Sequence, residues 1–444
     1  MTKCDKRIVD VIGVGLGPFN LGLAALLQGV PDVDGLFFEQ KPAFNWHPGM
    51  LIEGTTLQVP FLADLVTMAD ATSPYSFLNY LQENNRLYHF YFLERFHIPR
   101  REYNDYCQWV AGQLNGCRFG KRVDNIKRGE EYFEVDVYDA KQDVVEQFYS
   151  KHLVIGVGTV PTMPDAFQGP SAEDIFHSAD FLDHQERCRR AKSIAVVGSG
   201  QSAAEVFLTL LKDQTAYGYR LDWLTRSKGF FPMEYSKLGL EHFSPDYTNY
   251  FFNLPKEKRD AVFPQQDLLY KGIDTDTIAE IYDLLYERSI GGASPDVCLQ
   301  AMTEVTRIHE KPGDSGFELE LYQWQQEQRF TLESDIVIAG TGYRQHVPEC
   351  LSGLHSLIRW DEFGRYVVNK DYTLSLNEQG SNHIFVQNGE LHTHGVGAPD
   401  LGLGAHRNAV IINKLAGRDV YPVHERNVFQ HFGVKTRSEP YAIY

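Results

Sequence analysis

The feature that most constrains the fold of this chain is a glycine-rich turn near its start. An apolar run over 8–12 predicts a buried strand, and a helix rich in leucine and alanine is expected over 20–27. Pro18 suits the first turn of such a helix, because the N–H that it lacks would have no intrahelical partner. Three glycines separate the strand from the helix: Gly13, Gly15 and Gly17. This order predicts a β-α-β unit that binds a dinucleotide pyrophosphate at the positive end of the helix.

The same unit has an acid where a ribose is expected. A second apolar run, over 36–39, ends in Glu39. In dinucleotide-binding units a carboxylate at this place accepts hydrogen bonds from a ribose diol. We therefore predict that the first unit binds FAD through its adenosine ribose.

A second unit of the same kind begins at Ser193. Gly198, Gly200 and Ala203 fit the pattern G-x-G-x-x-A, and a helix is expected to follow as far as about Leu211. Two such units in one chain predict an α/β fold with two Rossmann-like dinucleotide-binding domains.

The strand after this second helix ends without an acid. The run over 221–225 is followed by Arg226, Ser227 and Lys228. A carboxylate here would repel a 2′-phosphate, whereas cations and a hydroxyl group favour one. The second unit is therefore predicted to bind NADPH rather than NADH. The alternative is a solvated basic turn.

Two further glycine segments, over 152–161 and 335–343, predict where the chain crosses between the domains. Paired crossings are expected when one domain is inserted into the other. The predicted division assigns 1–165 and 347–444 to the FAD domain and 166–235 and 291–346 to the NADPH domain. A small helical substrate-binding insertion is predicted over 236–290.

Periodicity supports a helical insertion. Apolar side chains recur at spacings of three and four over 275–286, which predicts a helix. The polar segment from Val423 onward is expected to be peripheral.

Composition argues against several other classes of protein. With 42 basic and 59 acidic residues among 444, the formal net charge is −17, which disfavours nucleic acid as the main partner. No apolar run approaches the ~20 residues of a membrane span, and no signal peptide is recognised, so a cytoplasmic enzyme is expected. The six cysteines contain no C-x-x-C pair, which speaks against zinc ribbons and flavin disulfide reductases. No metal site is expected.

An FAD-type unit followed by an NADPH-type unit suggests hydride transfer from a nicotinamide to a flavin. Without a cysteine pair, or Cys and His spacings for an iron–sulfur or haem group, molecular oxygen remains as the electron acceptor. A monooxygenase or an oxidase is the leading class.

An ordered set of motifs then extends over nearly the whole chain. In chain order they are Gly-Val-Gly-Leu-Gly-Pro-Phe-Asn (13–20), Phe-Asn-Trp-His-Pro-Gly-Met (44–50), Gln-Val-Pro-Phe-Leu-Ala-Asp-Leu-Val-Thr (58–67), Thr-Ser-Pro-Tyr-Ser-Phe-Leu (72–78), Gly-Ser-Gly-Gln-Ser-Ala (198–203), Gly-Thr-Gly-Tyr (340–343) and Thr-His-Gly (393–395). This set resembles the microbial N-hydroxylating flavin monooxygenases of hydroxamate siderophore biosynthesis, the lysine and ornithine N-monooxygenase family.

The resemblance implies that NADPH reduces FAD and that O2 forms a C4a-hydroperoxyflavin, which a neutral amine attacks to give a hydroxylamine. It implies a catalytic role for Gln58 beside the isoalloxazine ring, and places Trp46 and His47 in the flavin pocket. The alternatives are a turn amide for Gln58 and an aromatic core pair for the other two. The predicted cofactor-binding residues are Gly13, Gly15, Gly17, Pro18, Phe19, Glu39, Trp46, His47, Gln58, Gly198, Gly200, Gln201, Ser202, Arg226, Thr341 and Tyr343.

Departures from the family pattern bear on the substrate. Where amino-acid hydroxylases usually have a lysine that grips the α-carboxylate, this chain has Ala63. Leu240 stands for an asparagine that helps to hold the amino-acid head, and Gly402 for a serine. Tyr270 is also predicted to contact substrate. Losing the lysine removes the partner of a carboxylate and a repulsion against a second ammonium, which favours a diamine such as cadaverine or putrescine.

The predicted function is N-hydroxylation of one amine of an aliphatic diamine, with O2 as co-substrate, in hydroxamate siderophore biosynthesis. One alternative is an L-lysine N6- or L-ornithine N5-monooxygenase, whose substrate carboxylate could be held by Lys237 or Lys271. A further alternative is a non-catalytic NADP(H)-binding redox sensor. No nucleic acid and no integral membrane contact are expected, and the resemblance implies a homo-oligomer, either a dimer or a tetramer.

Overall fold

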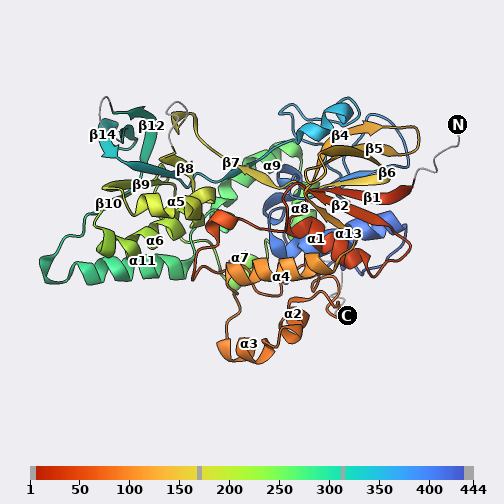
Figure 1. Ribbon diagram of the computed structural model, residues 1–444, viewed down its shortest axis with the longest axis horizontal. Helices are drawn as coiled ribbons and strands as arrows, with labels where there is room; N and C mark the ends of the chain where they lie inside the picture. Colours follow the sequence, from red (N-terminus) through yellow and green to blue (C-terminus); the bar gives the residue numbers. More distant parts are fainter. Residues whose placement is uncertain (1–6, 168–172, 312–315, 435–444) are drawn as a thin grey trace.

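The structure is a computed structural model that describes residues 7–167, 173–311 and 316–434 (Figure 1). Two large β-sheets form the centres of two lobes, the first built from both ends of the chain and the second from its middle. Both sheets have a parallel core with helices packed on it, so the predicted α/β class is confirmed. Among the described residues, no helix is long and apolar enough to cross a membrane.

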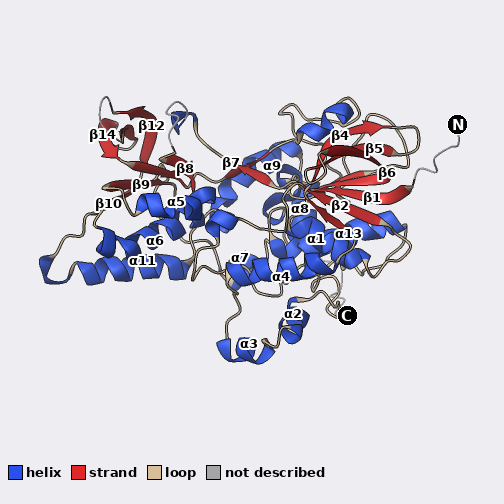
Figure 2. Cartoon of the chain, in the orientation of Figure 1, coloured by secondary structure: helices blue, strands red, loops and turns tan. Residues whose placement is uncertain are grey.

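The first sheet follows the N-terminal glycine turn. Its strands lie in the order β3 (Cys117–Phe119), β2 (Gly35–Glu39), β1 (Ile8–Val14), β6 (Val144–Ile155), β5 (Phe133–Asp139) and β4 (Lys121–Arg128), with β17 (Ile384–Val386) paired to the end of β6. The pairs from β3 to β6 and the pair with β17 are parallel, whereas β5 and β4 continue the sheet antiparallel. Helices α1 (Pro18–Leu27), α4 (Arg100–Gln113) and α13 (Gly404–Ala416) share one apolar core beside this sheet (Figure 2).

The second sheet is parallel throughout. Its strands lie in the order β11 (Val297–Gln300), β10 (Arg220–Leu224), β9 (Ser193–Val197), β15 (Ile336–Ala339) and β8 (Ile175–His177). Helices α5 (Phe181–Cys188), α6 (Gln201–Tyr217) and α11 (Thr275–Arg288) pack on one face. The other face packs against an antiparallel sheet of β12 (Thr303–Glu310), β13 (Phe317–Gln323) and β14 (Gln328–Ser334) (Figure 2).

A two-stranded ribbon lies between the lobes. It consists of β7 (Thr159–Pro161) and β16 (Tyr343–Gln345), which pair antiparallel. Strand β7 ends the first segment that was predicted to cross between domains, and β16 begins at the last residue of the second. The two crossings therefore lie side by side, as an insertion of the middle of the chain requires.

The segment over 236–290 is helical, as predicted. Besides α11 it contains α7 (Lys237–Leu240), α8 (Pro245–Asn253), α9 (Lys256–Val262) and α10 (Asp267–Tyr270). Its helices pack on different parts of the molecule: Ile281 of α11 joins the core of the second sheet, whereas Tyr247 of α8 clusters with Val396 near the short helix α12 (Leu391–His394). The domain boundaries stay a prediction, and α8 and α11 do not share one core.

Several element bounds differ from the sequence prediction. Strand β1 continues beyond Ile12, α1 begins already at Pro18, and α11 reaches Arg288. The segment after Val423 is less peripheral than expected, because Phe432 packs on Tyr247 with ring centroids 4.8 Å apart. Helix α2 (Phe77–Glu83) buries Phe77, Tyr80 and Leu81 in the core of the first lobe, whereas α3 (Leu87–Leu93) has no buried residue and protrudes from it (Figure 1).

Candidate active site

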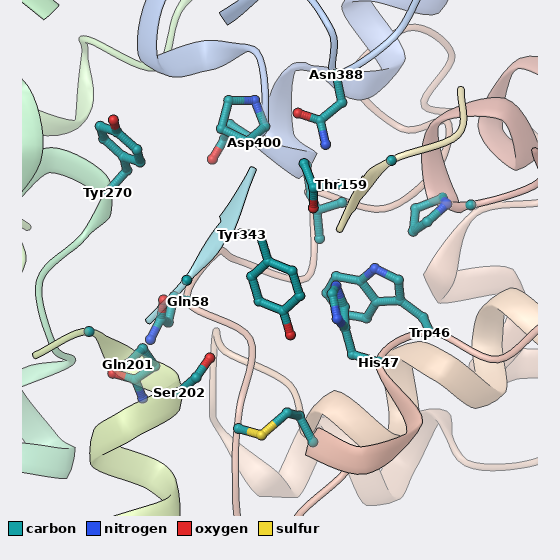
Figure 3. Close-up of a pocket in the computed structure, with 18 of the residues that line it drawn as sticks. Trp46, His47, Gln58, Thr159, Gln201, Ser202, Tyr270, Tyr343, Asn388 and Asp400 are labelled. Carbon is teal, nitrogen blue, oxygen red and sulfur yellow. The ribbon is translucent and has the colours of Figure 1, made fainter. Parts of the chain in front are cut away.

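A cavity of about 2810 Å³ is lined by residues of both glycine turns. Figure 3 shows that its walls combine side chains from segments far apart in the sequence. Of the residues predicted to bind cofactor or substrate, all except Gly13 line this cavity. The site predicted from sequence is therefore brought together by the fold.

Gly13 has a packing role instead. It lies within β1, and a Cβ at this position would come within 2.2 Å of Cδ1 of Phe37 in the neighbouring strand β2. The close approach of these two strands explains the glycine without a ligand.

The first turn combines a close backbone approach with a fixed carboxylate. Gly15 has a φ of +80°, and a Cβ there would lie 2.7 Å from the carbonyl oxygen of Gly156, so only glycine fits. The Glu39 carboxylate accepts hydrogen bonds from the backbone N–H of Leu16 (2.9 Å) and of Lys41 (3.0 Å). Each carboxylate oxygen keeps a further lone pair, so Glu39 is oriented to accept from a ribose diol as well.

Each glycine turn leads into a helix whose N-terminus opens onto the cavity. The residues concerned are Gly17, Pro18 and Phe19 at α1, and Gly200, Gln201 and Ser202 at α6. The backbone N–H groups of a first helical turn have no intrahelical acceptors and carry partial positive charge, so both helix ends attract phosphate.

The second turn is packed even more closely than the first. A Cβ at Gly198 would lie 2.1 Å from the Gly340 carbonyl oxygen, and the φ of Gly198 is +143°. The buried indole of Trp223 donates a hydrogen bond from Nε1 to the Gly198 carbonyl (2.8 Å). This bond ties the end of β9 to β10, and the close approach of Gly198 to Gly340 lets the end of β9 lie against the end of β15 beside the cavity.

The basic group after β10 is open to solvent and to the cavity. Arg226 is exposed and lines the cavity, and within the described ranges its guanidinium forms no ion pair. Ser227 beside it shares a hydrogen bond of 2.8 Å with the hydroxyl of Ser199 in the glycine turn. Lys228 does not line the cavity, so the predicted phosphate contact falls on Arg226 and Ser227.

Two residues predicted to bind cofactor form side-chain hydrogen bonds to other parts of the protein. The Gln201 side chain accepts a hydrogen bond from the Asp274 backbone N–H (2.7 Å) and donates one to Glu205 (3.0 Å). The Thr341 hydroxyl donates to the Thr162 carbonyl (2.5 Å). These bonds position α6 against α11 and one crossing strand against the other, and both residues still line the cavity.

An aromatic group forms another part of the wall (Figure 3). Trp46 is anchored through its backbone N–H, which donates to the Asn104 side chain (2.8 Å), and its ring packs edge-on against Tyr103 at 5.2 Å. The His47 ring lies 4.9 Å from Trp46 and 5.5 Å from Tyr343. Trp46 packs against the apolar core, as in the alternative interpretation, and both residues line the cavity.

These rings are uncharged near neutral pH. Burial, together with the nearby cations Arg100 and Lys41, lowers the pKa of His47 to about 4. Burial raises the pKa of Tyr343 to about 12. An uncharged, ring-lined pocket suits a flat heteroaromatic group.

Gln58 presents an unpaired donor to this pocket. Its Nε2 is buried and has no hydrogen-bond partner among the described residues. Its backbone carbonyl accepts a hydrogen bond from the Tyr235 hydroxyl (3.0 Å), which fixes the position of the residue. A buried unpaired N–H costs about 1–3 kcal/mol, so a ligand acceptor is expected here. The turn-amide alternative does not account for this donor.

The predicted substrate residues occupy another part of the wall. Ala63 is buried, and its Cβ would lie 3.8 Å from a Cβ placed on Gly402. Leu240, on α7, is 40% exposed, and Tyr270 ends α10. The departures from the family pattern at positions 63 and 402 are therefore neighbours in space.

The two lysines considered as carboxylate partners also line the cavity. The Nζ of Lys271 lies 2.8 Å from Asp267 Oδ1, so it already has an anionic partner. Lys237 is exposed on α7.

One acid on the wall was not found from the sequence. Asp400 lines the cavity, and burial raises the pKa of its carboxyl to about 6, opposed by hydrogen bonds from the backbone N–H groups of Gly402 and Leu403. The only signal available was an acid within a glycine-rich segment, and nothing in its spacing separates it from the other acids of the chain.

Two helix N-termini for phosphate groups, a ring-lined pocket and a single cavity between them define an oxidoreductase with two dinucleotide sites. The family model described as L-lysine 6-monooxygenase/L-ornithine 5-monooxygenase matches residues 7–345. The chain belongs to this family, which confirms the resemblance and the predicted class of enzyme, a monooxygenase.

Three similar proteins are informative about the substrate class and the pathway. The chain is similar to the rhizobactin siderophore biosynthesis protein RhbE of Rhizobium meliloti, with 46% identity over 432 residues that cover 96% of this chain and 95% of the relative. It is similar to the putrescine N-hydroxylase of Shewanella oneidensis, with 42% identity over 434 residues that cover 97% of this chain and 85% of the relative. Among solved structures it resembles FAD-bound DfoA, the desferrioxamine biosynthetic pathway cadaverine monooxygenase from Erwinia amylovora. The TM-score is 0.93 and the identity 41%, with 97% of this chain and 100% of that chain covered.

Proposed function

We propose that this chain N-hydroxylates one primary amine of an aliphatic diamine, with FAD, NADPH and O2, in hydroxamate siderophore biosynthesis. The observation that carries the substrate assignment is the pair Ala63 and Gly402, whose Cβ positions lie 3.8 Å apart on the cavity wall. A methyl group and a hydrogen atom cannot grip a carboxylate, and a diamine has none. The putrescine N-hydroxylase and the cadaverine monooxygenase among the relatives support the same assignment.

The residues present fit both cofactors. FAD belongs on the first turn, where Glu39 is oriented for a ribose and the unpaired Nε2 of Gln58 is available to a flavin acceptor. NADPH belongs on the second turn, where Arg226 has no anionic partner among the described residues and suits a 2′-phosphate. When bound, FAD reduced by NADPH supplies the activation of O2 that the reaction requires.

The chain itself binds, orients and excludes water. Gln58 is held through its backbone carbonyl by Tyr235, so its side-chain N–H donates from a fixed place. Trp46 and the neutral His47 close one side of the pocket with rings that keep water from the reacting atoms. A partly desolvated pocket also lowers the pKa of the reacting amine, which must be neutral to act as a nucleophile.

Product detection tests this proposal. The purified protein is expected to be yellow, to oxidise NADPH, and to form a hydroxylamine from cadaverine or putrescine. Both diamines are included because one methylene is worth only about 1–3 kcal/mol of discrimination. Hydroxylamine from L-lysine or L-ornithine alone would favour the amino-acid hydroxylase alternative, and a colourless protein without turnover would favour the redox sensor.

We also propose that the enzyme is a cytoplasmic homo-oligomer, either a dimer or a tetramer. Helix α3 exposes a patch of large aromatic side chains at Tyr88 (78%), Tyr91 (70%) and Phe92 (73%), whose rings contact one another. Contiguous exposed apolar patches mark protein–protein contacts. Light scattering of the native protein and of Phe92→Ser tests this: the native protein is expected above the monomer mass, and the variant shifted towards it.

A further inference from the structure

Asp400 lies between two short turns of helix, η7 (Gly395–Gly397) and η8 (Leu401–Leu403). Figure 3 shows it on the cavity wall across from Gln201 and Ser202, with Tyr343 between them in this view. Neither dinucleotide turn uses this carboxylate.

The absence of larger side chains opens Asp400 to the cavity. A Cβ on Gly402 would lie 2.8 Å from Asp400 Oδ1 and 3.8 Å from the Cβ of Ala63. A side chain at 402 would therefore crowd the carboxylate, and a long one at 63 would reach it. With alanine at 63 and glycine at 402, the carboxylate faces open space in the cavity.

The carboxylate also has no cation of its own. Within the described ranges, no lysine, arginine or histidine forms an ion pair with Asp400, whose known donors are the N–H groups of Gly402 and Leu403. The charge of the buried Arg407 acts on Asp400, but its guanidinium forms its contacts elsewhere: it pairs with Glu390 (3.1 Å) and donates to the Ala398 carbonyl (2.6 Å).

Two other acids on the cavity wall already have partners within the protein. Asp267 pairs with Lys271 (2.8 Å), and Asp274 caps α11 by accepting from the Thr277 N–H (3.0 Å). Asp400 thus differs from both in lacking a side-chain partner. A half-buried carboxylate without a counter-ion is stabilised by a cationic ligand.

We propose that the Asp400 carboxylate binds the distal ammonium of the diamine, the amine that is not hydroxylated. This inference rests on the proposed function and names the group that recognises its substrate. An ammonium carries three donors and fits beside an oxygen pair that already accepts two backbone N–H groups. The same charge repels the carboxylate of an amino acid, so Asp400 both selects diamines and disfavours lysine and ornithine.

Tyr235 connects this end of the pocket with the Gln58 end. Its hydroxyl donates to the Gln58 carbonyl (3.0 Å), and its pKa is raised by burial and, to a smaller extent, by the charges of Asp274 and Asp400. A bound diamine would extend between Gln58 and Asp400, with Tyr235 alongside.

The test compares Asp400→Asn with the native enzyme on two pairs of substrates of equal length. The pairs are cadaverine with n-pentylamine, and putrescine with n-butylamine. Asparagine keeps the size of the side chain and removes the charge, so the KM for the diamines is expected to rise by about 30-fold or more. The KM for the monoamines is expected to change by less than about threefold, because they have no distal ammonium.

Matched controls keep the result interpretable. Asp419→Asn removes the same charge at an exposed site outside the cavity and should leave all four substrates unchanged. Flavin content and substrate-free NADPH oxidation show whether Asp400→Asn folds, and Asp400→Glu should restore part of the preference for diamines.

The outcomes separate the two proposals. Suppose that the native enzyme hydroxylates diamines and that Asp400→Asn raises the KM for diamines no more than the KM for monoamines. Asp400 then does not bind the ammonium, and the proposed function stands. If the native enzyme hydroxylates only L-lysine or L-ornithine, the proposed function itself fails, and this assignment fails with it. A loss confined to the diamines supports the assignment.

Discussion

The two glycine turns share a backbone design and differ in the charged side chain that lies at or just after the end of the next strand. In the first lobe the acid Glu39 is tied by two backbone N–H groups and faces the cavity from a fixed position. In the second lobe Arg226 is exposed and, among the described residues, without an ionic partner. The shared helix ends attract any pyrophosphate, so cofactor selection lies in these two side chains.

The difference also suggests how each cofactor is used. A carboxylate fixed by the turn itself suits a cofactor that stays in place, whereas an exposed arginine suits a dinucleotide that enters from solvent. The two turns can therefore be disturbed independently, and the largest effect is expected where the backbone itself must move.

Replacing Gly198 by alanine should disable the second turn alone. The new Cβ would lie 2.1 Å from the Gly340 carbonyl oxygen, so the end of β9 must move. Since a displacement of about 1 Å can cost a factor of 10² in rate, flavin reduction by NADPH should fall about 100-fold. Stopped-flow reduction measures this, and dithionite should still reduce the bound FAD.

A matched change lies at the other end of the same helix. Gly218, the C-cap of α6, also has a positive φ, of +73°, but a Cβ there meets no atom within 4 Å. Gly218→Ala should cost about 1 kcal/mol of stability and leave flavin reduction intact. Equal losses in the two variants would show that the close approach at Gly198 is unimportant.

Ala63→Lys should spare both turns and damage only substrate use. The added ammonium would compete with the distal ammonium of the diamine for Asp400 and would also repel it. At an effective dielectric of about 20 and a separation of ~4 Å that repulsion is about 4 kcal/mol, as an upper bound. Diamine kcat/KM should fall by about tenfold or more, while substrate-free NADPH oxidation stays the same.

Ala261→Lys, on the exposed side of α9 and outside the cavity, is its control. Unchanged diamine turnover in a folded Ala63→Lys enzyme would mean that position 63 does not face the substrate.

Arg226→Ala isolates the side chain that distinguishes the second turn. Its charge-assisted bonds to the 2′-phosphate exist only for NADPH, so the KM for NADPH should rise about tenfold and that for NADH should hardly change. Lys228→Ala is the control, because Lys228 does not line the cavity. A similar rise for both cofactors would make Arg226 a structural residue.

The smallest effect is expected from Cys350→Ser. Cys350 is the cysteine on the cavity wall among those described, and burial raises the pKa of its thiol to about 11, so it is not a reactive thiolate. Flavin reduction should stay within about twofold of the native rate. Loss of electron transfer in a folded, FAD-loaded variant would indicate a thiol relay and contradict the account.

The turns could be predicted from the sequence because their information is local. Glycine spacing, the flanking apolar runs and the first polar residue after the next strand all lie within short segments, and the structure places them on one cavity. The assignment of Gly13 to the cofactor overlooked the contact with Phe37, which depends on how β1 and β2 pair.

Asp400 could not be predicted for a different reason. Asp400 is open to the cavity because Ala63 and Gly402 lack large side chains, and these two residues become neighbours only in the folded chain. The engagement of Gln201 with Asp274 is similarly a product of tertiary packing between α6 and α11. Sequence patterns report local backbone design, and they do not report which side chains are left without partners.

The central claim, that the substrate is a diamine, is tested most directly by competition in one vessel. Equal concentrations of cadaverine and L-lysine are supplied with NADPH and O2, and the two hydroxylamines are quantified at low conversion. Their ratio equals the ratio of the two kcat/KM values. The account predicts that N-hydroxycadaverine predominates by about tenfold or more. Predominance of N6-hydroxylysine would contradict it.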